Sequence, residues 1–347
     1  MNPVSQRLLS QQLICPQSAT PKEVVAWMGA VQAQDYKGMR WAVAMRTKRP
    51  SLKAFKEAFD SGEIVRIHLM RGTWQLVSAE DYWPMIGLCS PKALAVTRGW
   101  MAGNGISIPD DELFRIREIL CRIVADRRSA TKEDIVRGLA ERGITMDDHR
   151  LSYHIRMAEF DGVLCSGDLL PVKPSYSLST DKLPARKPFD RDETLMQLTL
   201  KYFRHAQPAT LEDFAWWTGL NLSDCRRGIG ILGNRLHKEK WQGRDFYLTE
   251  DSRTRGFRKG RCILLSPFDE YLISYKSRDI VLAREHTHRA HNGSGIFWPV
   301  FLMDGKVAGN WSSTKDKITV APFCGDDYID PEAIDAEITR YLAFLER

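Results

Sequence analysis

Short stretches of helical periodicity, each introduced by the same polar pattern, recur three times along the chain. "SATPKEV" begins at Ser18, "SATKEDI" at Ser129 and "PATLEDF" at Pro208. In each stretch a threonine precedes an acidic residue by three positions, as in a capping box, where hydroxyl and carboxylate satisfy the free N–H groups of a first helical turn. The three pairs are Thr20 with Glu23, Thr131 with Asp134, and Thr210 with Asp213. Apolar residues at helical spacing follow each pair, so three helices are predicted to begin here.

In the second and third copies the same order of elements follows the capped helix. A turn leads to a second amphipathic segment, "DDHRLSYHIRMAEF" or "SDCRRGIGILGNRL", and then to a hairpin. The first copy fits more loosely: its second helix is Tyr36 to Met45, an extra helix begins at Ser51, and its hairpin is "IVRIHLMRGTWQLV". Thr-x-x-acid is a common pattern, so chance is the alternative, but the shared order of elements favours three tandem winged-helix motifs.

After Arg261 the helical periodicity gives way to alternation and short apolar runs. "RCILLSPFDEYLISYKSRD" and "GIFWPVFLMDGKVAGNW" are typical of strands, and the second is predicted to turn at Asp304-Gly305. An amphipathic helix is expected from Pro331 onward. The chain is therefore predicted to be an α+β, mainly helical protein. Its expected divisions are three winged helices at 1–110, 111–190 and 191–260, and a small β unit with a C-terminal helix at 261–347.

The composition, with 43% hydrophobic and 27% charged residues, is typical of a water-soluble globular protein. No charged-then-apolar signal segment begins the chain, and no stretch approaches the ~20 apolar residues of a membrane span. The seven cysteines occur singly, which argues against both a disulfide framework and a zinc site. We therefore expect a cytoplasmic protein without a membrane partner. No phosphate-binding loop or Ser-His-Asp motif is found, and neither a metal nor an organic cofactor is predicted.

The net charge of +6 is unevenly distributed. The last 22 residues, from Asp326, hold seven acidic and two basic residues, so residues 1–325 carry 48 basic against 37 acidic side chains, a balance of +11. Five basic residues fall within nine positions from Arg253 to Arg261. A basic body with an acidic tail favours a polyanionic partner, although many proteins reach this charge without one.

Two glutamines, Gln32 and Gln34, lie where the first copy should have its turn, in "GAVQAQD". On a helix, residues two apart point about 200° away from each other and do not share a site. In an extended segment they point the same way, with Val31 and Ala33 facing inward. The sequence thus allows both amides to face one place on the surface that a winged helix presents to DNA.

Four segments resemble the AlkZ-like DNA glycosylases, and the resemblance covers nearly the whole chain. They are "GAVQAQD" (29–35), "HLMRGTWQLV" (68–77), "SPFDEYLISYKSRD" (266–279) and "GIFWPVFLMDGKVAGNW" (295–311). The resemblance implies tandem winged helices and a β-barrel-like unit around a basic channel. It also implies hydrolysis of the N-glycosidic bond of alkylated purines, including bases held in interstrand crosslinks. Its catalytic signature is matched by Gln32-Ala33-Gln34; in one branch the last position is Asp, and Asp35 comes one residue too late to match it.

The chemistry is consistent with two neutral amides. A purine alkylated at N7 or N3 is cationic and leaves as a neutral base, so it needs little protonation. The site must then hold a water at C1′ of an oxocarbenium-like sugar, and an amide oxygen can accept a hydrogen bond from that water. A neutral amide stabilises the cationic sugar less than a carboxylate would. We therefore expect the site to act only on bases that are already activated, which protects undamaged DNA.

Basic side chains on the predicted second helices, hairpin and loops are the candidate contacts to duplex DNA. Those of the first hairpin follow the glutamine turn directly, although simple solvation is the alternative for them. The loop "REHTHRAHNGSG" looks metal-like, but no nearby Cys or acid completes a ligand set, so DNA contact is the preferred interpretation. The predicted contacts are Arg66, His68, Arg71, Arg150, Arg226, Arg227, Arg284, His286 and His288.

The leading hypothesis is a monomeric, monofunctional DNA glycosylase whose partner is double-stranded DNA containing alkylated purines. The runner-up is a winged-helix DNA-binding regulator without catalysis, for which no effector site or dimerisation coiled coil is found. A protein-interaction scaffold is the third class, and it predicts no salt-dependent binding to DNA.

Overall fold

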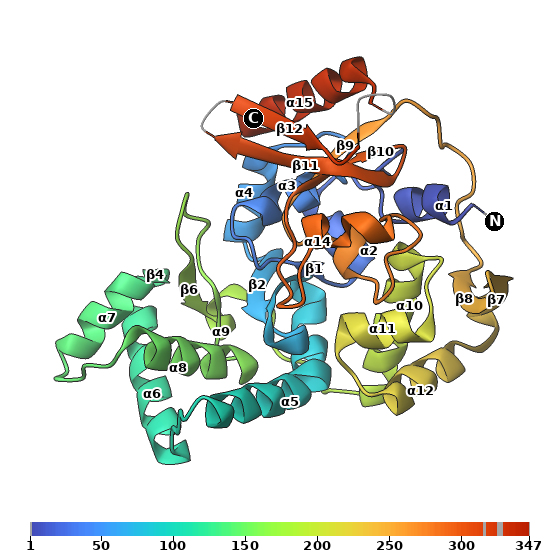
Figure 1. Cartoon of the computed structure of the whole chain (residues 1–347). Helices are drawn as coiled ribbons and strands as arrows, with labels where there is room; N and C mark the ends of the chain where they lie inside the picture. The colour runs from blue at the N-terminus through green and yellow to red at the C-terminus, as the bar shows by residue number, and fades with distance from the viewer. Residues whose placement is uncertain (1, 315–316, 325–328, 347) are drawn as a thin grey trace.

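The computed structural model describes residues 2–314, 317–324 and 329–346, which form helices and small antiparallel sheets (Figure 1). We divide these residues into a first unit (21–78), a second unit (110–182), a third unit (191–249) and a C-terminal unit (262–346). The long helix α5 (Ala79–Gly103) runs between the first and second units along the lower edge of Figure 1. The predicted α+β class is confirmed.

The first unit contains three helices and one three-stranded sheet. The sheet has the order β1-β3-β2, so the last strand of the unit lies in the middle. A one-turn helix, η1 (Met70–Gly72), joins β2 to β3. The helix α1 (Pro3–Ser10) precedes the unit, whose elements are α2 (Pro21–Met28), β1 (Val31–Gln32), α3 (Gly38–Ala44), α4 (Leu52–Asp60), β2 (Ile64–His68) and β3 (Trp74–Ser78).

The second and third units repeat an order of helix, edge strand, two helices and hairpin. In the second unit the sheet order is β4-β6-β5, and in the third an isolated bridge from Ala209 to Tyr247 takes the place of the edge strand. The second unit consists of α6 (Asp110–Arg127), β4 (Ala130–Thr131), α7 (Lys132–Ala140), α8 (Asp148–Phe160), β5 (Leu164–Ser166), β6 (Ser175–Leu178) and α9 (Ser179–Lys182). The third consists of α10 (Arg191–Ala206), α11 (Leu211–Thr218), α12 (Leu222–Leu232), η2 (Gly233–Arg235), β7 (Leu236–Trp241) and β8 (Arg244–Thr249).

The three predicted capping boxes are confirmed. The hydroxyls of Thr20, Thr131 and Thr210 each accept the N–H of the acidic residue three positions later, and each carboxylate accepts the threonine N–H in return. These bonds satisfy donors that every helix start leaves free, which explains why α2, α7 and α11 begin where the pattern places them. The hairpin β7–β8 turns at Gln242-Gly243, both at positive φ, as a two-residue turn requires.

The predicted equivalence of the three boxes is wrong for the first one. The second and third boxes follow the edge strand or bridge of their units, whereas the first box precedes β1, which is the edge strand of its own sheet. By position in the sheet, α2 therefore corresponds to α6 and α10. The pair of helices before the first hairpin is α3 and α4, so the helix at Leu52–Asp60 is not an insertion.

The C-terminal unit contains a four-stranded antiparallel sheet with the order β12-β11-β10-β9. Its outer strands β9 and β12 are not paired with each other in the described residues, so the sheet is open there and the barrel-like arrangement is not found. The predicted turn at Asp304-Gly305 is confirmed between β10 and β11. The elements are β9 (Cys262–Leu265), α13 (Glu270–Ile273), η3 (Arg284–His286), α14 (Thr287–Ala290), β10 (Val300–Met303), β11 (Lys306–Thr314), β12 (Lys317–Pro322) and α15 (Pro331–Glu346).

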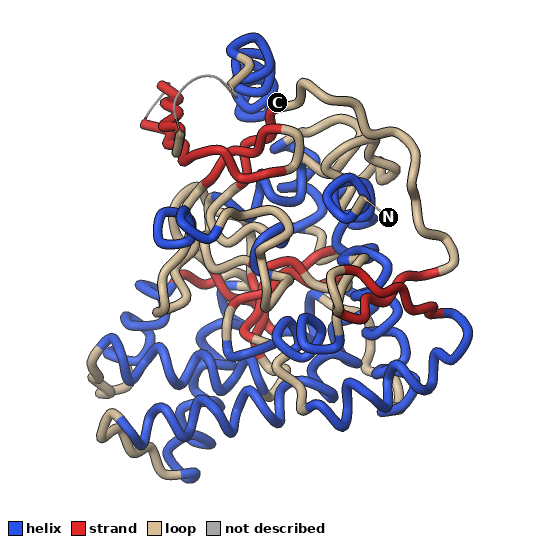
Figure 2. Tube along the Cα trace, turned by 45° about the vertical axis from the view of Figure 1, so that its right-hand side comes forward, coloured by secondary structure: helices blue, strands red, loops and turns tan. Residues whose placement is uncertain are grey.

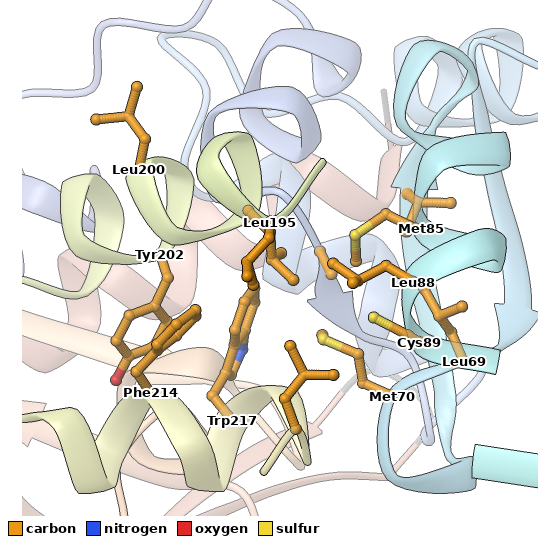
Figure 3. Packing of buried hydrophobic residues seen from close by; sticks show 14 of the residues in the cluster. Leu69, Met70, Met85, Leu88, Cys89, Leu195, Leu200, Tyr202, Phe214 and Trp217 are labelled. Atoms are coloured by element: carbon orange, nitrogen blue, oxygen red, sulfur yellow. The ribbon is translucent and has the colours of Figure 1, made fainter. Parts of the chain in front are cut away.

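The largest apolar core lies between the first and third units. Met70 of the first unit and α5 face the α10 and α11 helices, and Tyr202, Phe214 and Trp217 pack between α10 and α11 (Figure 3). The second unit has a separate core of its own around α6, α7 and α8. Figure 2 shows the short strands at two levels, with the C-terminal sheet above and long helices below. No helix in the described part of the chain is long and apolar enough to cross a membrane.

Candidate active site

The predicted extended backbone at Gln32 is present as the edge strand β1. Gln32 lies opposite Gln75 of β3, and the Ala33 N–H donates to the Trp74 carbonyl at 2.9 Å. Gln34 follows two residues later, at a bend beyond the end of β1. Gln32 is 4% exposed and Gln34 is half-buried.

The side chain of Gln32 is fixed by hydrogen bonds to its amide oxygen. Gln75 Nε2 donates to Gln32 Oε1, while Thr73 Oγ1 lies 3.3 Å and Arg71 Nη2 3.5 Å from the same oxygen. An arginine can only donate, so its contact distinguishes the oxygen of this amide from its nitrogen. Among the described residues no acceptor is found for Gln32 Nε2. The free group that Gln32 offers to a substrate is therefore an N–H donor.

In Gln34 it is the amide oxygen that has no hydrogen-bond partner among the described residues. Its Oε1 is buried and accepts no hydrogen bond within the described part of the chain. Such an atom forgoes a bond unless a water or ligand supplies one. Two glutamines that are two positions apart in the chain thus present one unused donor, from Gln32, and one unused acceptor, from Gln34. A water needs both kinds of partner to be held in a fixed orientation.

A buried carboxylate lies on the other edge of β1. Glu270, the first residue of α13, is 0% exposed, and its Oε1 accepts the backbone N–H of Gln32 at 2.6 Å. Its Oε2 accepts the Trp217 indole N–H at 3.0 Å. Burial raises the pKa of Glu270, while these donors and the Arg71 guanidinium oppose that rise. Glu270 connects the C-terminal unit, the first unit and the third unit at the glutamine strand.

Arg66 was expected to contact DNA, but its side chain is 5% exposed and points into the protein. Its Nε donates to the Ala33 carbonyl at 2.9 Å, and its guanidinium lies 4.3 Å from the ring centre of Trp74. Burial lowers the pKa of Arg66 to about 10. The prediction is wrong because the second unit covers β2, where the Arg66 N–H donates to Ser166.

His68 is buried by the same packing and is 3% exposed. Its Nδ1 contacts the carboxylate of Glu159 on α8, and its ring lies against Trp74. Burial lowers the pKa of His68, although the neighbouring Glu159 opposes this effect. His68 therefore joins the first and second units and is unavailable to DNA in this arrangement.

Arg71 is half-buried and is also engaged within the protein. Its backbone adopts φ 57°, in the left-handed region, which turns the side chain toward the end of α11. There its Nη1 donates to the carbonyls of Trp216, at 3.3 Å, and Trp217. The Arg71 guanidinium thus donates to these two carbonyls and to the Gln32 amide oxygen. Instead of the expected contact with a phosphate, it connects Gln32 to the third unit.

Two of the predicted helix contacts form ion pairs. Arg150 Nη2 lies 2.5 Å from Glu112 of α6, and Arg227 Nη2 lies 2.5 Å from Asp192 of α10. Both arginines remain accessible in part, with side chains 31% and 58% exposed. A paired arginine must exchange its carboxylate for a phosphate, so each is a weaker candidate for DNA binding than an unpaired one.

Arg226 is exposed and has no ion pair among the described residues. It lines a cleft of about 1050 Å³ between α12, the β7–β8 hairpin and the segment after α13. Lys238, Lys240 and Lys276 line the same cleft. Arg244 lines it as well, so the structure gathers five basic residues at one place, together with Glu212, Asp213 and Asp245, whereas the sequence prediction had singled out only Arg226.

The histidine loop lies beside the C-terminal sheet. Arg284 and His288 are exposed, while His286 Nε2 is 3.2 Å from Cys324 Sγ and its ring lies against Phe323. No group of three or more His, Cys, Asp or Glu side chains that could hold a metal ion is found in the described ranges. The DNA contacts assigned to Arg284, His286 and His288 remain predictions.

Sequence reasoning missed Gln75 and Glu270. Gln75 is a buried amide in the apolar strand "TWQLV", and a polar residue at a buried strand position is the signal that was available. Glu270 gave no such signal, because "FDEYL" is typical of an ordinary helix start. Its partner, the Gln32 N–H, is 238 positions away in the sequence.

Comparisons with known proteins identify the family. The profile of the family described as "DNA glycosylase AlkZ-like" matches residues 25–344. The chain is 24% identical over 337 residues to an "Interstrand DNA cross-link repair glycosylase" of Streptomyces sahachiroi, with 91% of this chain and 88% of that protein covered. The solved structure of the Streptomyces sahachiroi DNA glycosylase AlkZ superposes with a TM-score of 0.78 at 23% identity, covering 99% of this chain and 96% of that one, and so shares its fold. Because the family profile spans nearly the whole chain, this protein belongs to the AlkZ-like DNA glycosylase family.

Proposed function

We propose that this DNA glycosylase hydrolyses the N-glycosidic bond of cationic N7- or N3-alkylated purines in duplex DNA, with Gln32 and Gln34 holding the attacking water. The observation that carries the proposal is that Gln32 has an unused donor and Gln34, two residues later in the chain, has an unused acceptor. In the reaction the oxygen of water bonds to C1′ as the C1′–N bond breaks. The bonding electron pair neutralises the cationic purine, and the proton from water goes to solvent.

The amides have separate roles in this proposal. Gln34 Oε1 accepts a hydrogen of the water, which aims an oxygen lone pair at C1′, and Gln32 Nε2 donates to the other lone pair of that oxygen. This proposal gives Asp35 a structural role, because its Oδ1 accepts the N–H of Gly38 at 2.5 Å at the start of α3. Because the two groups proposed to hold the water are neutral amides, the leaving group must be activated by its own positive charge.

We further propose that the first three units are winged-helix motifs that hold the duplex. Their shared order of edge strand, helix pair and hairpin supports this proposal, because winged helices place the second helix in the major groove and the hairpin on the backbone. In the third unit, Arg226 and the lysines of the cleft would contact phosphates. The protein acts as a monomer without a cofactor, and its seven free cysteines suit a reducing cytoplasm.

Interstrand crosslinks are a further proposed substrate. The curated relative is named for the repair of such crosslinks and is covered over 88% of its length. A purine linked through N7 is cationic in the same way as N7-methylguanine, so the same water attack applies. An oligonucleotide crosslinked through N7 should be converted to single strands at a rate that falls with the Gln32 and Gln34 variants.

The first test is single-turnover excision of N7-methylguanine from a duplex, followed by an assay for abasic sites. Gln32→Ala and Gln34→Ala should each lower the rate about 30- to 1000-fold, corresponding to ~2–4 kcal/mol in the barrier when one preorganised hydrogen bond is lost. The two losses should not add, because either one frees the water. Duplex affinity should change little. Gln32→Ala should also lower stability, because the buried Gln75 amide loses its acceptor, so excision is compared per folded molecule.

Gln197→Ala, which removes an exposed glutamine bonded only to Glu193 of its own helix, is the matched control. A folded double variant, Gln32→Ala with Gln34→Ala, that excises at the parent rate would show that the active site lies elsewhere. A parent protein that binds duplex DNA with a strong salt dependence but releases no alkylated base would favour the regulator hypothesis.

A further inference from the structure

We propose that Glu270 is a positioning residue for base excision: its carboxylate fixes the backbone of Gln32, so that replacing it slows excision without weakening binding to duplex DNA. The inference rests on the proposed function, because it assigns a role to a residue behind the proposed catalytic amides. Glu270 contacts no part of the substrate in this proposal. It acts through Gln32.

Three donors meet at the Glu270 carboxylate. Oε1 accepts the Gln32 backbone N–H at 2.6 Å, and Oε2 accepts both the Trp217 indole N–H at 3.0 Å and the Ser274 hydroxyl. The N–H groups of Gln32 and Trp217 can only donate, whereas the hydroxyl of Ser274 can rotate to donate or accept. The site therefore requires a side chain that accepts a hydrogen bond at both ends, which a carboxyl group can do and an amide cannot.

This requirement makes glutamine an unsuitable replacement for Glu270 in spite of its equal size. A glutamine has one acceptor oxygen and one donor NH2 group. If the oxygen faces Gln32, the NH2 group meets the Trp217 N–H; if it faces Trp217, the NH2 group meets the Gln32 N–H. In either orientation one of these buried N–H groups loses its acceptor, and leaving a buried donor unpaired is unfavourable.

Loss of the Glu270 acceptor would displace Gln32, because β1 is an edge strand of only two residues. On one side β1 is paired with β3, through the Ala33 N–H to the Trp74 carbonyl. The Gln32 N–H points to the opposite side, where Glu270 receives it. A shift of the strand on that side moves the amide that is proposed to hold the water, and misplacement of a reacting group by 1 Å can lower a rate about 100-fold.

Glu270 and Arg71 both connect Gln32 to the end of α11. Glu270 connects the Gln32 backbone to the side chain of Trp217, while Arg71 connects the Gln32 side chain to the backbone carbonyls of Trp216 and Trp217. The end of α11 in the third unit is thus tied twice to the glutamine strand of the first unit. Asp269, the neighbour of Glu270, fixes α13 in turn through a buried ion pair with Arg46 at 2.7 Å.

The test compares Glu270→Gln with the parent in three measurements: single-turnover excision of N7-methylguanine, affinity for the same duplex, and thermal unfolding. Excision should fall about 10- to 100-fold at saturating enzyme, while the duplex Kd stays within about twofold, since phosphate contacts lie elsewhere. The backbone amides of the segment 29–38 should exchange hydrogen for deuterium faster in Glu270→Gln than in the parent, because the Gln32 N–H loses a secure acceptor.

Glu337→Gln is the matched control. Glu337 is likewise buried, at 6% exposure, and its Oε1 accepts a strand N–H, that of Leu264 in β9 at 3.4 Å. This substitution should lower the thermal stability but leave excision per folded molecule unchanged. A general loss of stability therefore cannot reproduce the pattern expected for Glu270→Gln.

A second variant tests the acceptor argument itself. Trp217→Phe removes the competing N–H. In the double variant, Glu270→Gln with Trp217→Phe, the oxygen of the introduced amide is free to accept from Gln32 while its NH2 group donates to Ser274. The double variant should excise faster than Glu270→Gln alone, although Trp217→Phe by itself lowers excision through lost packing. Purely structural effects would instead make the double variant slower than either single one.

Three outcomes overturn the inference. These are a folded Glu270→Gln variant that excises at the parent rate, a loss of excision that merely follows a loss of duplex affinity, and a double variant without rescue. If the parent excises no alkylated purine, the proposed function fails instead. In that case the hydrogen-exchange comparison still decides whether Glu270 fixes the Gln32 backbone.

Discussion

At the scale of the residue, burial decides what a polar side chain does. Arg66 and His68 stand in the hairpin that follows the glutamine strand and have the charge and position of phosphate ligands, yet both are under 6% exposed. Arg66 instead donates to the carbonyl of Ala33, the residue between the two catalytic candidates. A buried guanidinium that is hydrogen-bonded and stacked on Trp74 serves the architecture of the site, and not the binding of DNA.

Arg66→Ala is therefore expected to act on stability. Removing the guanidinium leaves the Ala33 carbonyl without a donor and a cavity beside Trp74, so urea unfolding should show a loss of ~2–4 kcal/mol. Arg284→Ala, at an exposed position, should change the unfolding free energy by less than about 0.5 kcal/mol. An Arg66→Ala protein of parent stability with a weaker salt dependence of DNA binding would restore the original assignment.

At the scale of the element, the β7–β8 hairpin and α12 combine into one basic cleft. Lys240 and Arg226 are both exposed and have no ion pair in the described part of the chain. Lys238 and Arg244 of the same cleft are paired with Asp245 and Asp279. Arg226 and Lys240 therefore supply the unpaired charges that a phosphate entering this cleft would meet. This is the physical reason to rank the cleft above Arg150 and Arg227, which are paired with Glu112 and Asp192.

The double variant Arg226→Ala with Lys240→Ala should weaken binding to undamaged and alkylated duplex alike, because phosphate contacts carry no lesion information. Each lost contact reduces the slope of log affinity against log salt by about 0.9, which a titration at several salt concentrations measures. The control is Lys22→Ala with Lys173→Ala, whose charges are paired with Glu80 and Glu133. Equal slopes for parent and cleft variant would remove this cleft from the DNA-binding surface.

At the scale of the whole molecule, packing between units buries histidines in the neutral form. His205 of α10 is 0% exposed, and burial lowers its pKa to about 3. The unfolded chain protonates this residue near pH 6.5. Between these two values the unfolded state binds more protons, so the free energy of unfolding falls as the pH falls through this window.

His205→Asn should flatten this dependence. The asparagine amide can still donate to the Lys201 carbonyl, which His205 Nδ1 approaches at 2.9 Å, but it does not titrate. Measured by urea unfolding between pH 6.5 and 5, the variant should lose less stability than the parent, by up to about 1.4 kcal/mol per pH unit. Parallel pH profiles for parent and variant would show that His205 does not contribute to acid unfolding.

The sequence by itself determined the features that depend on a few neighbouring residues. Capping boxes, the two-residue turns at Gln242-Gly243 and Asp304-Gly305, and the extended backbone at Gln32 all follow from local spacing and backbone preference. The resemblance of four short segments also identified the family. These features were accessible because steric limits and hydrogen bonds between residues up to four apart fix them without help from the rest of the chain.

Only the tertiary structure decided how those local pieces are used. The edge-strand position of β1 corrected the equivalence of the first copy, and the second unit packed against β2 turned two expected DNA contacts inward. The orientation of the Gln32 amide and its link to Glu270 depend on residues 43 and 238 positions away. A pattern along the chain records which side chains are polar. Which polar group lacks a partner, and is therefore free for water or DNA, depends on distant segments meeting in space.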